Sequence, residues 1–219
     1  MSASMEGRLR TLVLLVAPIV LVAAFAYHPY VGSLLDTDLI AEKAADDADR
    51  WAMSHVVLAI SVGLVIVALL SIRHQLRAHG DERWSFISVP LAVFGLAVIG
   101  STAGMEITLA AAINAGADPV AIVDAAEPWA GGIYAIGGIA LSLGLLGLAI
   151  GTYRAMPLGG QLDRIAAGAF VVVAVANFVP HSIAEYVIGA AIVVALWPFA
   201  YREWEEEASP AMETGMSRA

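Results

Sequence analysis

Cysteine is absent from this chain, and lysine occurs only once, as Lys43. Without cysteine the chain has no disulfides, no thiolate zinc site, no iron–sulfur cluster and no cysteine nucleophile. Basic residues are also scarce, because 11 Lys and Arg stand against 20 Asp and Glu, which gives a net charge of −9. Nucleic-acid binding needs clustered basic side chains that neutralise phosphates, so the composition excludes nucleic acid as a partner.

Sequence motifs for catalysis are missing as well. The chain has no glycine-rich phosphate loop, no glycine-flanked serine elbow and no His-Glu-x-x-His zinc helix. The sequence therefore identifies no catalytic residue. It favours a protein that is not an enzyme, without excluding one.

Apolar residues, in contrast, make up 60% of the 219 positions, whereas soluble domains contain roughly 45–50%. A helix needs about 20 mostly apolar residues to cross the hydrocarbon core of a bilayer. Six stretches meet this need, at residues 11–30, 51–72, 86–113, 129–153, 165–179 and 182–201. The sequence therefore predicts an all-α fold, a polytopic transmembrane helical bundle of about six spans whose main partner is the lipid bilayer.

The arginines between these stretches predict the orientation of the bundle. If the chain crosses the membrane six times, its basic residues gather on one side, at Arg8, Arg10, Arg73, Arg77, Arg83, Arg154, Arg164 and Arg202. Positively charged loops stay in the cytoplasm, so we expect both termini inside. Since the basic residues are nearly all arginine, which is typical of a GC-rich genome, we expect a multi-pass protein of a prokaryotic cell membrane.

Two terminal segments set the limits of the transmembrane helical domain, which we expect to cover residues 1–202. Residues 203–219 are acidic and predict a disordered cytoplasmic tail. The first span allows a second interpretation, because Arg8 and Arg10, an apolar run and small residues at 24–26 also occur in cleaved signal peptides. The length of this run and Pro18 within it favour a retained span.

Two features are expected at the membrane surface. Residues 33–50 predict a short extracytoplasmic surface helix, whose apolar side chains would touch the membrane through Leu34, Leu35, Leu39 and Ile40. Tryptophan rings prefer the boundary between headgroups and tails, and all five lie at or near predicted span ends, namely Trp51, Trp84, Trp129, Trp197 and Trp204. The tryptophans therefore support the predicted boundaries.

Ionisable residues within spans are costly, so each one is a candidate functional residue. Glu106 lies in the third span and His55 in the second, while His181 and Glu185 share one face of the last span. All four fall in the outer half of the membrane. They form the predicted polar intramembrane site, to which we add His28, Tyr134 and Asn177 as possible members at similar depth.

The same residues permit several uses. A divalent metal such as zinc could be held by His55, His181, Glu185 and Glu106, as in a membrane metallohydrolase. Glu106 could instead carry a proton that it exchanges with His55. A single haem could have His55 and His181 as its two axial ligands, as in a b-type cytochrome. No cofactor is assigned, because polar residues that only stabilise helix packing would give the same pattern.

Glycines at helical spacing allow two helices to approach closely. Gly147 and Gly151 lie in the fourth span, and Gly100 and Gly104 lie in the third. These faces predict tight packing inside the bundle, or alternatively a homo-oligomer or partner membrane protein. We therefore expect a protein that binds or moves a small ligand, proton or metal ion through an outward-facing polar site, with a non-enzymatic accessory subunit as the alternative.

Overall fold

The computed structural model describes the backbone of residues 3–216 and the side chains of residues 5–206. This part of the chain forms seven helices and no strand. The helices are α1 (Ala3–Tyr27), α2 (Thr37–Asp46), α3 (Ala48–Ala78), α4 (Arg83–Asn114), α5 (Pro119–Ala155), α6 (Gln161–Ala176) and α7 (Ser182–Met216). The predicted all-α fold is therefore confirmed.

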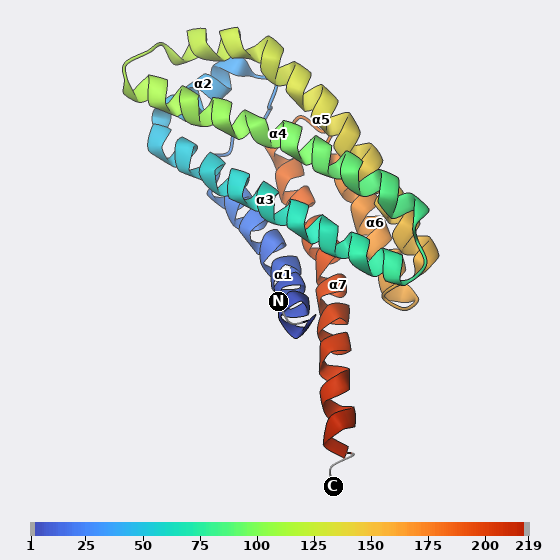
Figure 1. Cartoon of the computed structure of the whole chain (residues 1–219). Coiled ribbons are helices and arrows are strands. Elements are labelled where there is room, and N and C mark those ends of the chain that lie inside the picture. The colour runs from blue at the N-terminus through green and yellow to red at the C-terminus, as the bar shows by residue number, and fades with distance from the viewer. Residues whose placement is uncertain (1–2, 217–219) are drawn as a thin grey trace.

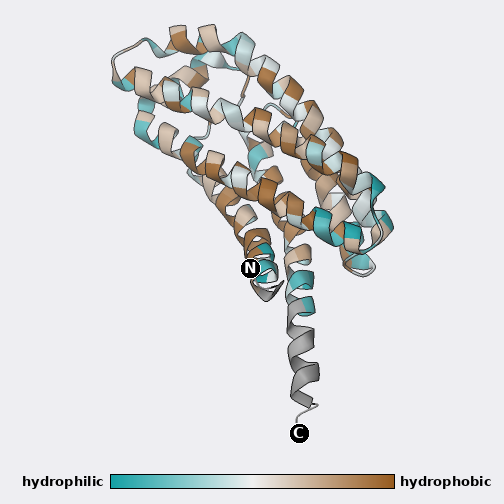
Figure 2. Ribbon diagram, in the orientation of Figure 1, coloured by the Kyte–Doolittle hydropathy of each residue, from teal (hydrophilic) through white to brown (hydrophobic). Residues whose placement is uncertain are grey.

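Five of these helices, α1, α3, α4, α5 and α7, are long and apolar enough to cross a membrane. Their middle parts are mostly hydrophobic, and polar residues gather near several helix ends (Figure 2). The remaining predicted span, 165–179, corresponds to α6, which has 16 residues and a length of about 24 Å. The protein is thus a membrane-spanning helical bundle in which α6 is the short member.

The helices are arranged as a closed ring. Around the bundle they follow one another in the order α1, α3, α4, α5, α6 and α7, and α7 returns to pack against α1. Helix α1 begins, and α7 ends, at one end of the bundle, whereas α2 lies at the opposite end (Figure 1). Both chain ends therefore lie on the same side, which is the arrangement that an even number of crossings produces.

Glycines bring α4 and α5 into close contact. A Cβ atom at Gly144 would overlap the amide nitrogen of Ala92, and one at Gly147 would lie 2.8 Å from Cβ of Ser88. Gly151 faces the carboxyl group of Asp81 in the same way. Two of the predicted glycine positions are thus occupied by packing within the chain.

The glycines of α4 differ from each other. A Cβ atom at Gly100 would lie 3.1 Å from a methyl group of Val62 on α3, whereas Gly104 has open space around it. Of the four glycines proposed for a partner surface, Gly104 alone has no neighbour within the described residues.

Helix α1 closes the ring with one face. Leu14, Ala17, Leu21 and Ala24 recur every three or four positions, and all four are buried. Helices α3 and α7 cover this face. Cleavage after position 26, the second interpretation of this segment, would remove these contacts from the ring.

A polar cluster joins three helices near the start of α1. The Nε group of Arg10 lies 2.6 Å from Oε1 of Glu203 on α7, and Nε2 of Gln75 on α3 donates to Oε2 of the same carboxylate at 2.7 Å. Glu203 is buried, with 4% of its surface exposed. We call these three residues the inner latch.

One residue of the inner latch, Glu203, lies within the segment expected to be a disordered tail. Helix α7 continues through Met216, and Arg10 and Gln75 hold Glu203 against the bundle. Residues 217–219 of the expected tail lie outside the described residues.

Helix α2 covers the end of the bundle opposite the two chain ends (Figure 1). Asp36 accepts a hydrogen bond from the amide of Leu39 and so caps the start of the helix. Ala41 and Ala44 are buried in a cluster with Trp51 and residues of α4 and α5. The predicted surface helix is therefore present. Of the four residues expected to touch the membrane, Leu39 and Ile40 pack against this protein cluster, whereas Leu34 and Leu35 are exposed.

Candidate functional site

Glu106 of α4 is connected to α3 by a hydrogen bond inside the bundle. The indole Nε1 of Trp51 donates to Oε2 of Glu106 at 3.0 Å. Trp51 is 2% exposed, so the expectation that it anchors the lipid boundary is wrong for this residue. Trp129, in contrast, is 74% exposed, as expected of a boundary residue. The remaining oxygen of Glu106 makes no hydrogen bond to any described residue.

Two histidines pack beside this pair. The rings of His28 and His55 meet edge to face with centroids 5.0 Å apart. Each ring also contacts the indole of Trp51, at 5.0 and 5.2 Å. Nδ1 of His55 lies 2.8 Å from the carbonyl oxygen of Trp51. Because a carbonyl only accepts, this nitrogen carries the proton, which leaves Nε2 of a neutral His55 as a free acceptor.

Tyr134 of α5 extends the site towards the opposite side of the ring. Its hydroxyl lies 3.2 Å from Oγ1 of Thr102 on α4. Thr102 and Glu106 are four positions apart on α4 and so share a face, which places Tyr134 on the side of α4 that carries Glu106. Glu185 lies in the first turn of α7.

These two glutamates have no basic partner. No ion pair joins Glu106 or Glu185 to Lys or Arg within the described residues. The nearest candidate along α3 is Arg50, which donates to the carbonyl oxygen of Tyr27 at 2.9 Å and lies over the ring of that tyrosine. The site therefore has acidic groups that are not neutralised by the protein.

The other predicted members make separate contacts. His181 packs on Tyr30, and its Nδ1 accepts a hydrogen bond from the amide of Ile183, so it caps the start of α7. Asn177 ends α6 and donates to the carbonyl oxygen of Gly138. Neither residue makes a hydrogen bond to Glu106 or His55.

His28 lies one residue beyond the end of α1. Burial, followed by the charge of the neighbouring His55 and that of Arg50, lowers the pKa of His28 to about 4. Its Nδ1 atom is buried without a hydrogen-bond partner among the described residues. The His28 ring is therefore neutral at pH 7.

The histidines and carboxylates of the described residues include no group of three or more that could hold a metal ion. His55 has a histidine neighbour in His28, whereas the imidazole of His181 is engaged at the start of α7.

Trp51 is the site residue that the sequence did not suggest. It was interpreted as a boundary residue because of its type and its position at a predicted span end. One signal was available, since Trp51 and His55 are four positions apart and so share a helix face. The pairing with Glu106 depends on how α3 and α4 are rotated, which that spacing does not specify.

No protein-family model matches this chain, and neither a curated protein nor a solved structure matches it. Any functional assignment therefore depends on the chemistry of the residues themselves.

Proposed function

We propose that this chain is a multi-pass protein of the cell membrane that takes up a small cation, at its simplest a proton, from the outer side. The site is formed by Glu106 and Glu185, with Tyr134 of α5 and with Trp51, His55 and His28 on its α3 side. An accessory subunit without ligand is the competing function.

One observation carries this proposal. Two carboxyl groups, those of Glu106 and Glu185, lie within membrane-spanning helices, and no described basic residue pairs with either. An isolated carboxylate in a membrane is expensive, so it either binds a cation or takes up a proton. Both outcomes make Glu106 and Glu185 the binding groups.

The histidines support exchange with the outside. His55 keeps Nε2 as an acceptor, and His28 connects it to the segment that follows α1. A neutral imidazole can accept a proton on one ring nitrogen and release a proton from the other, so it can pass a proton on. The proposed route for a proton thus runs from His28 to His55 and then to the carboxyl groups.

Glu106→Gln tests this function in the purified full-length protein. Glutamine keeps an oxygen that can accept from Trp51, so the bundle is retained while the charge is lost. We expect proteoliposomes with the wild-type chain to transmit an outside pH jump to an internal pH-sensitive dye, and the Glu106→Gln and Glu185→Gln variants to lose that response.

The unfolding temperature in the presence of small cations is a second measurement on the same samples. Titration with sodium, calcium or methylammonium ions should raise the unfolding temperature if one of them is the ligand, since a ligand at 100 times its Kd stabilises by about 2.7 kcal/mol. Glu127→Gln is the matched control, because Glu127 is an exposed glutamate of α5. Responses that are identical in wild type and both site variants would contradict the proposal.

The competing function, an accessory subunit without ligand, is supported by contacts between helices. The Trp51–Glu106 hydrogen bond joins α3 to α4, and glycine contacts join α4 to α5. If these groups only hold helices together, Trp51→Phe should lower the unfolding temperature, while wild-type proteoliposomes do not transmit the pH jump and cations do not raise the wild-type unfolding temperature. The two measurements above thus separate the candidates.

A further inference from the structure

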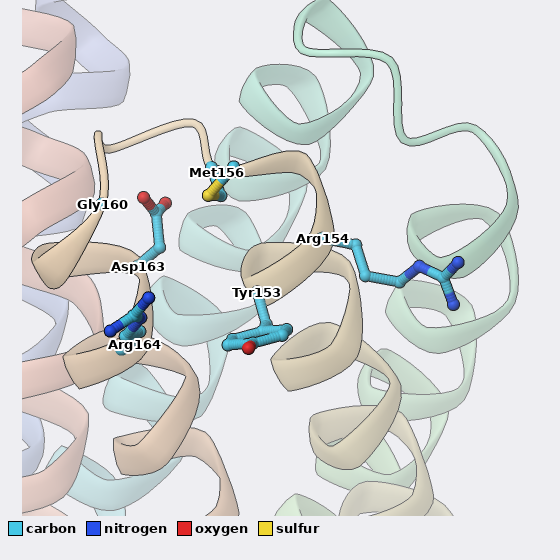
Figure 3. A pocket seen from close by; sticks show the side chains of 6 residues that line it. All are labelled: Tyr153, Arg154, Met156, Gly160, Asp163 and Arg164. Carbon is cyan, nitrogen blue, oxygen red and sulfur yellow. The ribbon is translucent and has the colours of Figure 1, made fainter.

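A cavity of about 320 Å³ lies between the end of α5 and the first turn of α6 (Figure 3). It belongs to the arginine-rich end of the bundle, opposite the candidate site. Its lining consists of Tyr153, Arg154, Met156, Gly160, Asp163 and Arg164.

Asp163 supplies a buried acceptor to this cavity. It is 1% exposed, and its Oδ1 accepts a hydrogen bond from the amide of Leu158 at 2.8 Å. Oδ2 is buried without a partner among the described residues. Figure 3 shows the carboxyl group turned towards the loop between Met156 and Gly160. Because a buried acceptor without a hydrogen bond destabilises the folded protein, a ligand that donates a hydrogen bond to Oδ2 would be favoured here.

A positive region lies beside that acceptor. Gly160 precedes α6 and offers no side-chain cap, and the acid of the first turn, Asp163, accepts from the amide of Leu158 outside the helix. The first N–H groups of this 16-residue helix therefore still favour an anion. Arg164 is exposed and forms no ion pair with any described residue. Arg154 extends away from the other side chains in Figure 3, so Arg164 is the guanidinium next to the cavity.

The loop around the cavity has a defined shape. Met156, Gly159 and Gly160 adopt positive φ angles of 48°, 86° and 74°, and Leu158 is buried in the main core. Tyr153, at the end of α5, is 58% exposed. An exposed aromatic ring and an arginine at the end of a spanning helix are typical of the headgroup layer.

We infer that this cavity binds the headgroup of a phospholipid that combines a phosphate with a hydrogen-bond donor. The phosphate lies at Arg164 and the start of α6, and an ammonium or hydroxyl group of the same headgroup donates to Oδ2 of Asp163. Such headgroups include phosphoethanolamine and phosphoglycerol. Phosphocholine, whose nitrogen has no N–H, lacks the donor.

Native mass spectrometry of the full-length protein tests this site. The protein is released from detergent in the presence of phosphatidylethanolamine, phosphatidylglycerol or phosphatidylcholine, each with the same acyl chains. We expect the first two to be retained about tenfold better than phosphatidylcholine, as one charge-assisted hydrogen bond allows. Equal retention of all three would overturn the inference.

Two variants locate the site. Asp163→Asn keeps an oxygen for the amide of Leu158, and it should abolish the preference over phosphatidylcholine. Arg164→Gln should weaken all three lipids, while Arg77→Gln, an exposed arginine on the same side, should not. Unchanged binding in Arg164→Gln would contradict the assignment.

Glycerophosphoethanolamine distinguishes a lipid from a soluble ester, because it carries the same headgroup without acyl chains. We expect that this compound at millimolar concentration does not displace the lipid. Displacement would show that the site takes a water-soluble phosphodiester and would overturn the lipid as its occupant.

Discussion

At the scale of single residues, Glu106 and Trp51 illustrate two different kinds of inference. Glu106 could be selected from the sequence because carboxyl groups are rare in apolar spans. Trp51 could not, because a tryptophan at a span end has the same sequence signature whether it faces lipid or a buried glutamate. Its 2% exposure and its bond to Glu106 come from the rotation of two helices.

His28 gives a prediction at this scale. Its pKa of about 4 in the folded protein lies below the ordinary value of 6.5, so the unfolded chain binds a proton first as the pH falls. Stability is therefore fully present above pH 6.5 and is lost progressively towards pH 4. The loss is at most about 3 kcal/mol, because one pKa unit corresponds to about 1.36 kcal/mol.

Thermal unfolding in detergent between pH 7.5 and 4.5 measures this effect. The His28→Phe variant should show a smaller decrease in unfolding temperature over that range than the wild type. His74→Gln is the control, since His74 is an exposed residue of the opposite end. If His28→Phe and His74→Gln have the same pH dependence, the buried neutral state of His28 is wrong.

At the scale of elements, α4 and α5 form the closest helix pair, and their glycines determine its spacing. A Cβ atom at Gly144 would overlap the backbone of Ala92, so Gly144→Ala has to separate the helices. We expect a loss of about 1–3 kcal/mol in unfolding free energy, as for other overpacked cores. Calorimetry or thermal unfolding of the purified variant provides the measurement.

Gly168→Ala is the matched control for that substitution. Gly168 lies in α6, and a Cβ atom there would meet nothing within 4 Å. Because alanine is the better helix former, its stability should stay unchanged or rise by up to about 1 kcal/mol. Equal destabilisation by both substitutions would mean that helix spacing is not the cause.

Helix α5 begins ten residues before the span that the sequence predicted. A span was predicted at 129–153, whereas the helix runs from Pro119 to Ala155. Asp118 followed by Pro119 is a helix-start signal, so the sequence contained enough information to predict the earlier start of α5. The packing of α2 on α5 was not readable, because an amphipathic helix buries its apolar face equally well in a membrane or on a protein.

At the scale of the whole molecule, the apolar runs predicted where the helices of the bundle lie along the chain. They did not predict which helices are neighbours, since lipid-facing and protein-facing surfaces are both apolar. The closed ring and the contact of His28 with His55 follow from those neighbours. The sequence could therefore predict how deep in the membrane the candidate site residues lie, but not which residues they contact.

The inner latch gives a prediction for the whole bundle. Glu203→Ala leaves Arg10 and Gln75 without their shared carboxylate, and removing one partner of a buried pair costs roughly 3–5 kcal/mol. Because Arg10 is 23% exposed, we expect a smaller loss of about 2 kcal/mol. Glu206→Ala removes an exposed partner of Arg202 and should change the unfolding free energy by less than about 1 kcal/mol. Similar losses in both variants would contradict the latch.

The contact between α1 and α7 also determines when the bundle is completed during synthesis. The first helix to leave the ribosome shares an interface with the last one, so the buried face of α1 around Leu14 and Ala17 has only α3 as a partner until α7 is inserted. A stalled or shortened chain that lacks α7 would expose this face to lipid. The cell's membrane quality control would therefore encounter an open arc of helices whenever translation ends early.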